Sequence, residues 1–500
     1  MELTIRQDRE TVRGVLTALL LAAAFSLVFY ICNTPLGPAI GSDNAMYLTM
    51  GTALAQGYAP YTEIFDHKGP LLFALQALPQ ILSGGYSTLS VFVQEVLFIW
   101  AGLLLLAHMA RRLGVRAVLV QLVYLALCAP LADGGNLTEE YASLFTLAGL
   151  DIMLAVFGEG LSREREKRLF APALCMGALA MLAFMTRANN ALVLAGAVCG
   201  LALYLLATKR FAALGRCAGG FVLGCALAAA PFVIWLAAQG ALEEAVYGSI
   251  LHNMMYTETQ GPSRLRMLLL DRYGHRAMFM AALACLGAAC AAVRTRRYAL
   301  PLAMVAGAAC GGAAAFLSHK FYAHYLLLSA PMAALGAAQV LAFLRERFPR
   351  TLRAVSAGAA AACALVLAVC GVQAEALRRA GDASMQALTP QAQALYALVP
   401  EEERDSFMAY RVEPRWYVAA EALPCMRFYF LQEILADADP AVMDEIVATF
   451  ESEPPRWVVL FYNRPFSPPY DVRVQAILDT RYEFVAAQGE YQLLRLKETL

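Results

Sequence analysis

The chain has 500 residues, of which 60% are hydrophobic and only 16% are charged, and its 39 Lys and Arg balance its 39 Asp and Glu. A soluble globular protein has roughly 45–50% apolar and 25% charged residues. This composition excludes a wholly water-soluble chain, and the zero net charge gives no reason to expect a nucleic-acid partner.

Long apolar stretches dominate the first three quarters of the chain. A transmembrane helix needs roughly 17–25 mostly apolar residues, and eleven stretches are of this kind. We therefore predict a membrane all-α bundle of about eleven helices, the first of which is retained and is not a cleaved signal peptide. The predicted spans are 15–32, 86–110, 117–133, 141–157, 170–186, 190–207, 217–238, 277–293, 298–317, 322–344 and 354–374.

The connecting loops alternate in charge. The N-terminus and every second loop hold twenty Lys and Arg between them, whereas the other loops, with their helix ends, hold about seven. Basic loops stay in the cytoplasm. We therefore expect a multi-pass protein of a prokaryotic plasma membrane, with its N-terminus inside and its C-terminus outside.

Two outer segments are long enough to carry structure of their own. The first, residues 33–85, contains the apolar stretch Leu71 to Leu82, which is too short to span a bilayer and suits a helix in the membrane interface. The second, residues 239–276, contains another amphipathic candidate at 263–272.

The tail predicts a small folded domain. Residues 406–412, 457–462 and 491–496 have the β-branched and aromatic composition of strands. Residues 432–449 have the pattern of an amphipathic helix. We thus divide the chain into a membrane domain, 1–375, and an extracytoplasmic α/β domain, 376–500.

Chemically active side chains concentrate in the predicted outer loops. Five of the six histidines lie there or at outer helix ends. The same face carries Asp43, Asp66, Lys68, Arg187 and Lys320. An enzyme that acts on a charged, lipid-anchored substrate needs this concentration at one water–lipid boundary. The cysteines have no C-x-x-C spacing, so no cofactor is predicted, although the sequence leaves a divalent cation open.

A series of short motifs follows the same face. Gly41-Ser42-Asp43-Asn44 comes after the first helix, followed by Gly57-Tyr58-Ala59-Pro60-Tyr61 and Phe65-Asp66-His67-Lys68-Gly69-Pro70. Later come Thr186-Arg187-Ala188-Asn189 and Ser318-His319-Lys320-Phe321-Tyr322-Ala323-His324-Tyr325. This series resembles the GT-C glycosyltransferases, in the branch of protein O-mannosyltransferases and lipid A aminoarabinose transferases. The usual Pro after the arginine is Ala188 here.

The resemblance implies a reaction and roles for these residues. Such enzymes move a sugar from a polyprenyl-phosphate donor to an acceptor nucleophile, with inversion expected from a single displacement. Asp43 is then the general base. The donor phosphate would be bound by Lys68, Arg187, Lys320 and His324. Substrate-binding residues would be Asp66, Tyr61, His319 and Tyr322. The sequence does not identify the sugar. It also does not say whether the acceptor is a lipid, a glycan or a protein.

Each candidate also has a simpler explanation. Asp43 would serve as the N-cap of a helix that starts near Asn44, and Asp66 would only tether Lys68. The cations would extend to lipid headgroups, and the histidines would form interfacial hydrogen bonds. Glu139 and Glu140 would border the site, or Glu140 would cap the next helix. Asp151, inside a span, favours an interhelical hydrogen bond.

Two other function classes compete with the enzyme. A transporter or flippase of lipid-linked saccharides would show internal repeats and charged or broken helices at mid-membrane, and the sequence has no clear repeat. An inactive scaffold or sensor relative would have no need of both Asp43 and Lys68.

Overall fold

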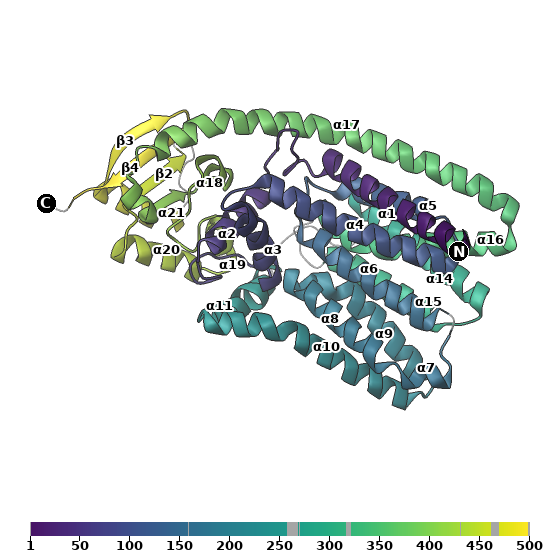
Figure 1. Ribbon diagram of the computed structural model, residues 1–500. Coiled ribbons are helices and arrows are strands. Elements are labelled where there is room, and N and C mark those ends of the chain that lie inside the picture. Colours follow the sequence, from purple (N-terminus) through teal and green to yellow (C-terminus); the bar gives the residue numbers. More distant parts are fainter. Residues whose placement is uncertain are drawn as a thin grey trace. The chain divides into compact units, whose positions relative to one another are not determined.

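The computed structural model describes residues 2–158, 160–257, 269, 271–316, 322–430, 432–461 and 470–498. The chain divides into two compact units. The first, here the helical unit, comprises Met1–Tyr30, Phe92–Val233 and Gln260–Glu375. The second, the mixed unit, comprises Ile31–Val91, Ile234–Thr259 and Ala376–Leu500. Figure 1 labels their elements.

The helical unit is a bundle of long apolar helices. Its α-helices are α1 (Glu2–Phe29), α4 (Thr88–Leu113), α5 (Ala117–Cys128), α6 (Thr138–Phe157), α7 (Arg163–Lys167), α8 (Phe170–Thr186), α9 (Leu192–Ala207), α10 (Phe211–Ala238), α14 (Arg272–Thr295), α15 (Ala299–Ala315), α16 (Ala330–Arg347) and the first part of α17 (Pro349–Tyr396). Short 3₁₀ turns connect some of them, namely η1 (Ala129–Leu131), η2 (Ala188–Ala191) and η4 (Ala323–Ser329).

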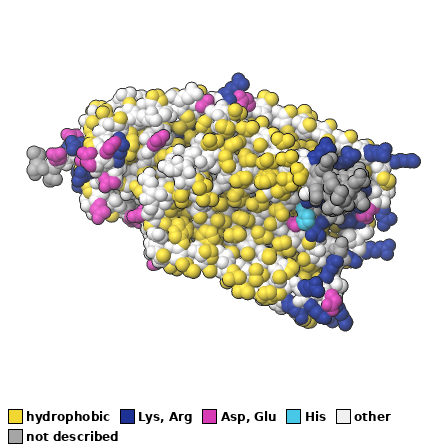
Figure 2. Space-filling view, in the orientation of Figure 1, with side chains coloured by type: hydrophobic (Ala, Val, Ile, Leu, Met, Phe, Trp, Pro, Cys, Tyr) yellow, Lys and Arg dark blue, Asp and Glu magenta, His cyan; other side chains and the backbone are white. Residues whose placement is uncertain are grey.

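These helices match the predicted spans. Among the described residues, eight helices are long and apolar enough to cross a membrane, and the three other predicted segments are shorter apolar helices. Large apolar side chains face outward, such as Val222, which is 66% exposed, and Val372, which is 73% exposed. Apolar side chains also cover the visible face of the bundle in Figure 2. A surface of this extent needs an apolar solvent, and the chain is a multi-pass membrane protein.

Basic side chains gather at one end of the helical unit, as Figure 2 shows. Arg345 at the end of α16 donates to the Gly114 carbonyl between α4 and α5, at 2.6 Å. Arg294 at the end of α14 lies 3.2 Å from Glu346. The basic loops that the charge pattern assigned to one side of the membrane therefore lie at the same end of the bundle.

Glycines let the helices pack backbone to backbone. A Cβ built on Gly287 of α14 would lie 2.3 Å from the Gly336 Cα of α16. Gly200 of α9 is similarly close to the Leu302 carbonyl of α15. Small residues at such crossings are typical of helix packing in lipid.

The mixed unit holds the predicted interfacial helix and the C-terminal sheet. Its helices are α2 (Ser42–Ala55), α3 (Pro70–Ser83), α11 (Leu242–Val246), the π-helix η3 (Tyr247–His252), α12 (Asn253–Thr257), the 3₁₀ turn η5 (Glu401–Ser406), α18 (Arg415–Ala420), α19 (Gln432–Ala438), α20 (Ala441–Ser452) and α21 (Tyr470–Arg481). The stretch Leu71 to Leu82 forms α3, whereas most of the second interfacial candidate lies outside the described residues.

The C-terminal sheet has the strand order β1-β2-β4-β3. Strands β1 (Phe407–Tyr410) and β2 (Trp457–Phe461) run parallel, with Phe407 opposite Trp457. Strand β4 (Tyr491–Leu496) pairs antiparallel with both β2 and β3 (Tyr482–Gln488). Three strands were predicted and β3 was missed.

One predicted helix of the tail is two helices. The expected helix 432–449 breaks between α19 and α20, because Pro440 has no amide hydrogen to continue the first helix. The Asp439 carboxylate accepts from the Ala441 amide at 3.0 Å, which starts α20 instead.

A methyl group at the α14–α16 crossing tests this packing. We expect Gly287→Ala to destabilise the protein by roughly 1–3 kcal/mol, because the added Cβ must displace the backbone of α16. The measurement is thermal unfolding in detergent. Gly312→Ala in α15 is the matched control, since its Cβ would meet open space and Ala favours a helix by about 1 kcal/mol over Gly. Equal unfolding midpoints for the two variants would contradict the close crossing.

Candidate functional site

The predicted site residues form two clusters, one in each unit. The first, here the loop cluster, lies in the mixed unit and comprises Asp43, Tyr47, Asp66, His67 and Lys68. The second, the arginine cluster, lies in the helical unit and comprises Asp133, Glu139, Arg187, Tyr322, His324 and Tyr325. Each cluster contains residues of the motifs quoted above, together with residues that lie outside those motifs.

Asp43 lies in the first turn of α2, and its residue is exposed. The helix begins at Ser42 with Gly41 as its N-cap, and Gly41 offers no side-chain hydrogen bond. The N-cap interpretation of Asp43 is therefore wrong, because the helix starts one residue before the carboxylate. Its position leaves the carboxylate accessible to a reacting group.

Lys68 lies buried in the loop before α3. Its residue is 8% exposed. Its Nζ lies 3.6 Å from Asp66 Oδ1 and 6.0 Å from the centroid of the Tyr47 ring. Tyr47 is one turn beyond Asp43, on the same face of α2. A lysine held in this way does not extend to lipid headgroups.

His67 lies between Asp66 and Lys68. Its Nδ1 is 3.2 Å from Asp66 Oδ1 and its Nε2 is 2.9 Å from Lys68 Nζ. An ammonium group can only donate, so Nε2 must accept and the hydrogen of a neutral His67 then sits on Nδ1. The imidazole thus lies in close contact with both the acid and the lysine.

Asp66 is fully buried, and its Oδ1 lies 3.6 Å from the Lys68 ammonium nitrogen. Burial raises the pKa of Asp66, an effect that Lys68 opposes and that the charge of Asp43 reinforces. The pKa of Asp66 thus responds to the charge of Asp43, so the two acids interact electrostatically. A buried carboxylate of this kind depends on its cation, so the tethering interpretation of Asp66 agrees with its surroundings.

Two hydrogen bonds to backbone carbonyls also position the loop cluster. Tyr61, which has a left-handed φ of 64°, donates its hydroxyl to the Lys68 carbonyl at 2.8 Å and is fully buried. Asn253 donates to the His67 carbonyl at 2.7 Å. The neighbouring His252, in the π-helix, is also fully buried, and burial lowers the pKa of this group. The enclosed Tyr61 ring positions Lys68 and has no open face for a substrate.

Arg187 is the centre of the arginine cluster. It follows α8 with extended backbone, at φ −165° and ψ 137°. One guanidinium nitrogen lies 3.3 Å from Glu139 Oε1 and another donates to the Tyr325 hydroxyl at 2.9 Å. The residue is 7% exposed, so Arg187 also does not extend to headgroups.

His324 joins this cluster through η4. Its Nδ1 is 2.9 Å from Asp133 Oδ2, and the Tyr322 ring stacks on the imidazole at 5.5 Å. The turn η4 begins at Ala323, and the backbone of Tyr322 before it is extended. His319 and Lys320 lie outside the described residues.

The remaining acidic candidates have structural partners. Glu140 accepts from the Leu137 amide at 3.2 Å and so caps α6, as one interpretation predicted. Asp151 of α6 lies 2.9 Å from the His108 imidazole of α4, which confirms the interhelical contact. By contrast, no motif predicted the contacts that Glu139 and Tyr325 make with Arg187.

Comparison with solved structures identifies the fold. ArnT from Cupriavidus metallidurans bound to undecaprenyl phosphate matches at a TM-score of 0.61 and 16% identity, over 97% of both chains. Its apo structure matches at a TM-score of 0.59 and 15% identity, over 95% of this chain and 97% of ArnT. The chain therefore has a GT-C-like, ArnT-like fold, as predicted.

Comparison by sequence gives the family. No curated protein matches the chain. The model of the family described as "Putative competence-induced protein Ccs4 N-terminal domain" matches residues 4–353, which is more than half of the chain. The chain belongs to this family.

Proposed function

We propose that this protein is a membrane glycosyltransferase that moves a sugar from a polyprenyl-phosphate donor to an acceptor at the outer face of a prokaryotic plasma membrane. The observation that carries the proposal is the loop cluster, in which the exposed Asp43 lies one turn before Tyr47 on α2 and the buried Lys68 ammonium lies 6.0 Å from the centroid of the Tyr47 ring. The fold supports it, because an ArnT structure of this fold holds undecaprenyl phosphate. The motif order also resembles the O-mannosyltransferase and aminoarabinose transferase branch.

The reaction is a single displacement. An acceptor hydroxyl attacks the anomeric carbon of the donor, and its proton passes to the Asp43 carboxylate. A new glycosidic C–O bond forms while the C–O bond to phosphate breaks. The polyprenyl phosphate leaves with the bonding electron pair, and the anomeric centre inverts. Asp43 suits the base role because it is exposed at the start of α2.

We assign the buried cations to binding the phosphate group of the donor. Fixed positive charges that are shielded from water stabilise a growing negative charge without reorganising. Lys68 meets this condition, since Asp66 and His67 hold it in place. Arg187 and His324 are held by acidic partners in the same manner. We assign all three to donor binding, with Lys320 added by resemblance and with His319 and Tyr322 as substrate-binding residues.

The basic end of the helical unit sets the orientation. Basic loops stay cytoplasmic, and those of this bundle lie together at one end. We infer that this end faces the cytoplasm, with the N-terminus, and that the C-terminal sheet lies outside. Residues 376–500 then form the extracytoplasmic domain, together with the outer loop 33–85.

The base role predicts the behaviour of Asp43→Asn. We expect the rate of undecaprenyl phosphate release to fall by roughly 10²–10⁴-fold, the usual contribution of a general base, while binding of undecaprenyl phosphate persists. The measurement uses the purified protein in lipid nanodiscs with a panel of undecaprenyl-phosphate-linked hexoses and pentoses, together with hydroxyl-bearing lipids, glycans and peptides as acceptors. Asp444→Asn, an exposed carboxylate of the same unit, is the matched control.

Three outcomes discriminate between functions. Release that is unchanged in Asp43→Asn removes this residue from the base role. Movement of the intact lipid-linked sugar across a vesicle membrane, without any release by the wild type, favours the transporter. A wild type that neither releases nor moves the lipid contradicts both.

The loop cluster predicts an asymmetry between Lys68 and Asp66. Lys68→Met leaves a buried carboxylate unpaired, and we expect a loss of roughly 3–5 kcal/mol of stability. The double variant Lys68→Met/Asp66→Asn removes both charges, so its unfolding midpoint should recover. Added undecaprenyl phosphate should raise the unfolding midpoint of the wild type but should not raise that of the double variant. A double variant that is stabilised as strongly as the wild type would disprove the phosphate-binding role of Lys68.

A further inference from the structure

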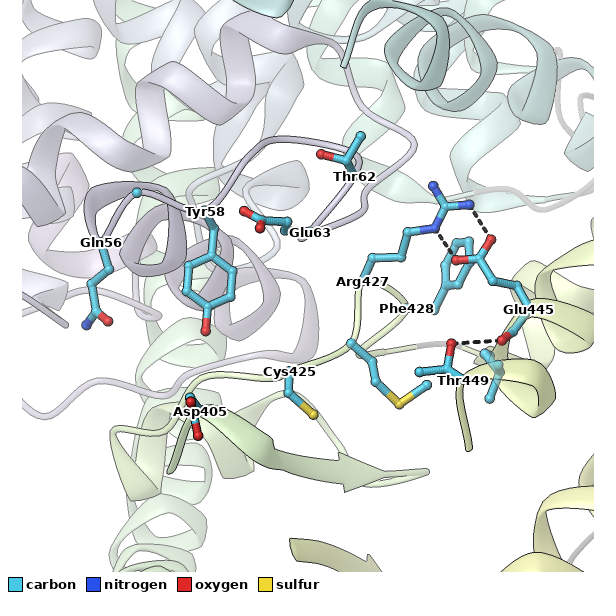
Figure 3. A pocket seen from close by; sticks show the side chains of 13 residues that line it. Gln56, Tyr58, Thr62, Glu63, Asp405, Cys425, Arg427, Phe428, Glu445 and Thr449 are labelled. Carbon is cyan, nitrogen blue, oxygen red and sulfur yellow. Dashed lines mark hydrogen bonds and ion pairs between the residues drawn. The ribbon is translucent and has the colours of Figure 1, made fainter. Parts of the chain in front are cut away.

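A polar cavity of about 510 Å³ lies within the mixed unit. Figure 3 shows its walls, which come from residues 56–63 between Tyr47 and Asp66, from Asp405, from residues 425–428 and from α20. Its volume is within the range of about 300–1,000 Å³ that small-ligand sites occupy. Neither Asp43 nor Lys68 lines it, so it is a separate site from the loop cluster.

The lining side chains suit a ligand with many hydroxyl groups. Tyr58, Thr62 and Thr449 supply hydroxyls, and Gln56 supplies an amide. Tyr58 also offers an aromatic ring, which Figure 3 shows beside Glu63. Burial raises the pKa of Tyr58, so its phenol stays a hydrogen-bond donor. An aromatic ring surrounded by donors and acceptors is the combination that binds the apolar face and the hydroxyl edge of a sugar ring.

The charges of the cavity argue against an anionic ligand. Arg427 is the only cation among the described lining residues. Its Nε and one terminal nitrogen bind the Glu445 carboxylate, and its other terminal nitrogen donates to Glu244 at 2.8 Å. The guanidinium is thereby neutralised. Since the carboxylates of Glu63 and Asp405 also line the cavity, a phosphate or a uronic acid would meet net repulsion.

One chain segment forms part of this cavity and also carries the loop cluster. The Phe65 amide donates to the Arg427 carbonyl at 3.0 Å, and the Phe65 and Phe428 rings lie 5.0 Å apart. Tyr61, whose carbonyl accepts from Arg427 at 3.4 Å, donates in turn to the Lys68 carbonyl. A ligand in the cavity thus lies against the segment that presents Lys68.

We propose that this cavity binds the acceptor, and that the acceptor is a glycan segment without negative charge. That the bound glycan is the acceptor rests on the proposed glycosyl transfer. That the cavity binds a glycan does not depend on it. The acceptor hydroxyl reacts as described above, with its proton passing to Asp43. The cavity therefore determines which molecules are glycosylated, and the loop cluster determines that the donor is a phosphate-linked sugar.

The test is the binding of three trisaccharides to the full-length protein in detergent, measured by isothermal titration calorimetry. The probes are the trimers of N-acetylglucosamine, glucosamine and galacturonic acid, which are neutral, cationic and anionic. We expect the first two to bind and the galacturonic acid trimer to bind at least about tenfold more weakly. A tenfold difference corresponds to about 1.4 kcal/mol.

Variants assign the binding to the cavity. Tyr58→Ala should weaken binding of the N-acetylglucosamine trimer by about tenfold, from the loss of an aromatic contact. Glu63→Gln/Asp405→Asn should weaken only the glucosamine trimer. Phe484→Ala, which removes a 60% exposed ring of β3 that does not line the cavity, is the control. Unfolding midpoints check that each variant is folded.

The outcomes separate this proposal from the proposed function. Equal affinity for all three trimers, no binding below about 10 mM, or an unchanged affinity in Tyr58→Ala would overturn the cavity assignment. Asp43→Asn should bind the trimers as the wild type does. If Tyr58→Ala binds normally while Asp43→Asn loses undecaprenyl phosphate release, the acceptor site is wrong and glycosyl transfer stands. If the trimers bind in the cavity but the wild type releases no undecaprenyl phosphate, glycosyl transfer is wrong and the glycan site stands.

Discussion

The cost of burying a charge governs both clusters of this protein. A buried ammonium or guanidinium group is tolerated only beside a partner of opposite charge. Lys68 has Asp66 and the His67 imidazole, and Arg187 has Glu139 and a tyrosine hydroxyl. Each partner comes from a loop or a helix end, so satisfying the charges also fixes the shape of the polypeptide there. The cations are consequently ordered before any substrate arrives, which is what electrostatic stabilisation of a leaving phosphate requires.

Periodicity and apolar length predicted most of the fold, because both are local properties. All eleven predicted spans are apolar helices, and the short interfacial stretch is α3. The misses have physical causes. Strand β3 is at the sheet edge and mostly exposed, so its sequence lacks a buried pattern. Helix α17 continues well past its apolar stretch to Tyr396, where the sequence no longer differs from that of a soluble helix.

The candidate site was predictable only in part. Motifs in the loops identified Asp43, Lys68 and Arg187, because such motifs are contiguous in sequence. Their partners depend on packing between distant segments: Glu139 and Tyr325 meet Arg187 from α6 and η4. Similarly, nothing local indicates that Asn253 ties the His67 carbonyl. The cavity was not predictable from the sequence, because residues 425–428 of its lining are more than 350 positions from residues 56–63, which form another wall.

One short segment of the mixed unit contributes both to the cavity and to the loop cluster. Residues 57–68 line a glycan-compatible cavity at one end and carry Lys68 at the other, with Tyr61 between them in a left-handed conformation. Such a conformation persists in a residue other than glycine only when its surroundings hold it. Here the Phe73 ring, whose centroid lies 4.4 Å from that of Tyr61, and the hydrogen bond from the Tyr61 hydroxyl to the Lys68 carbonyl do so. The cavity and Lys68 therefore share a rigid connection, and a ligand that moved one end of the segment would have to move the other.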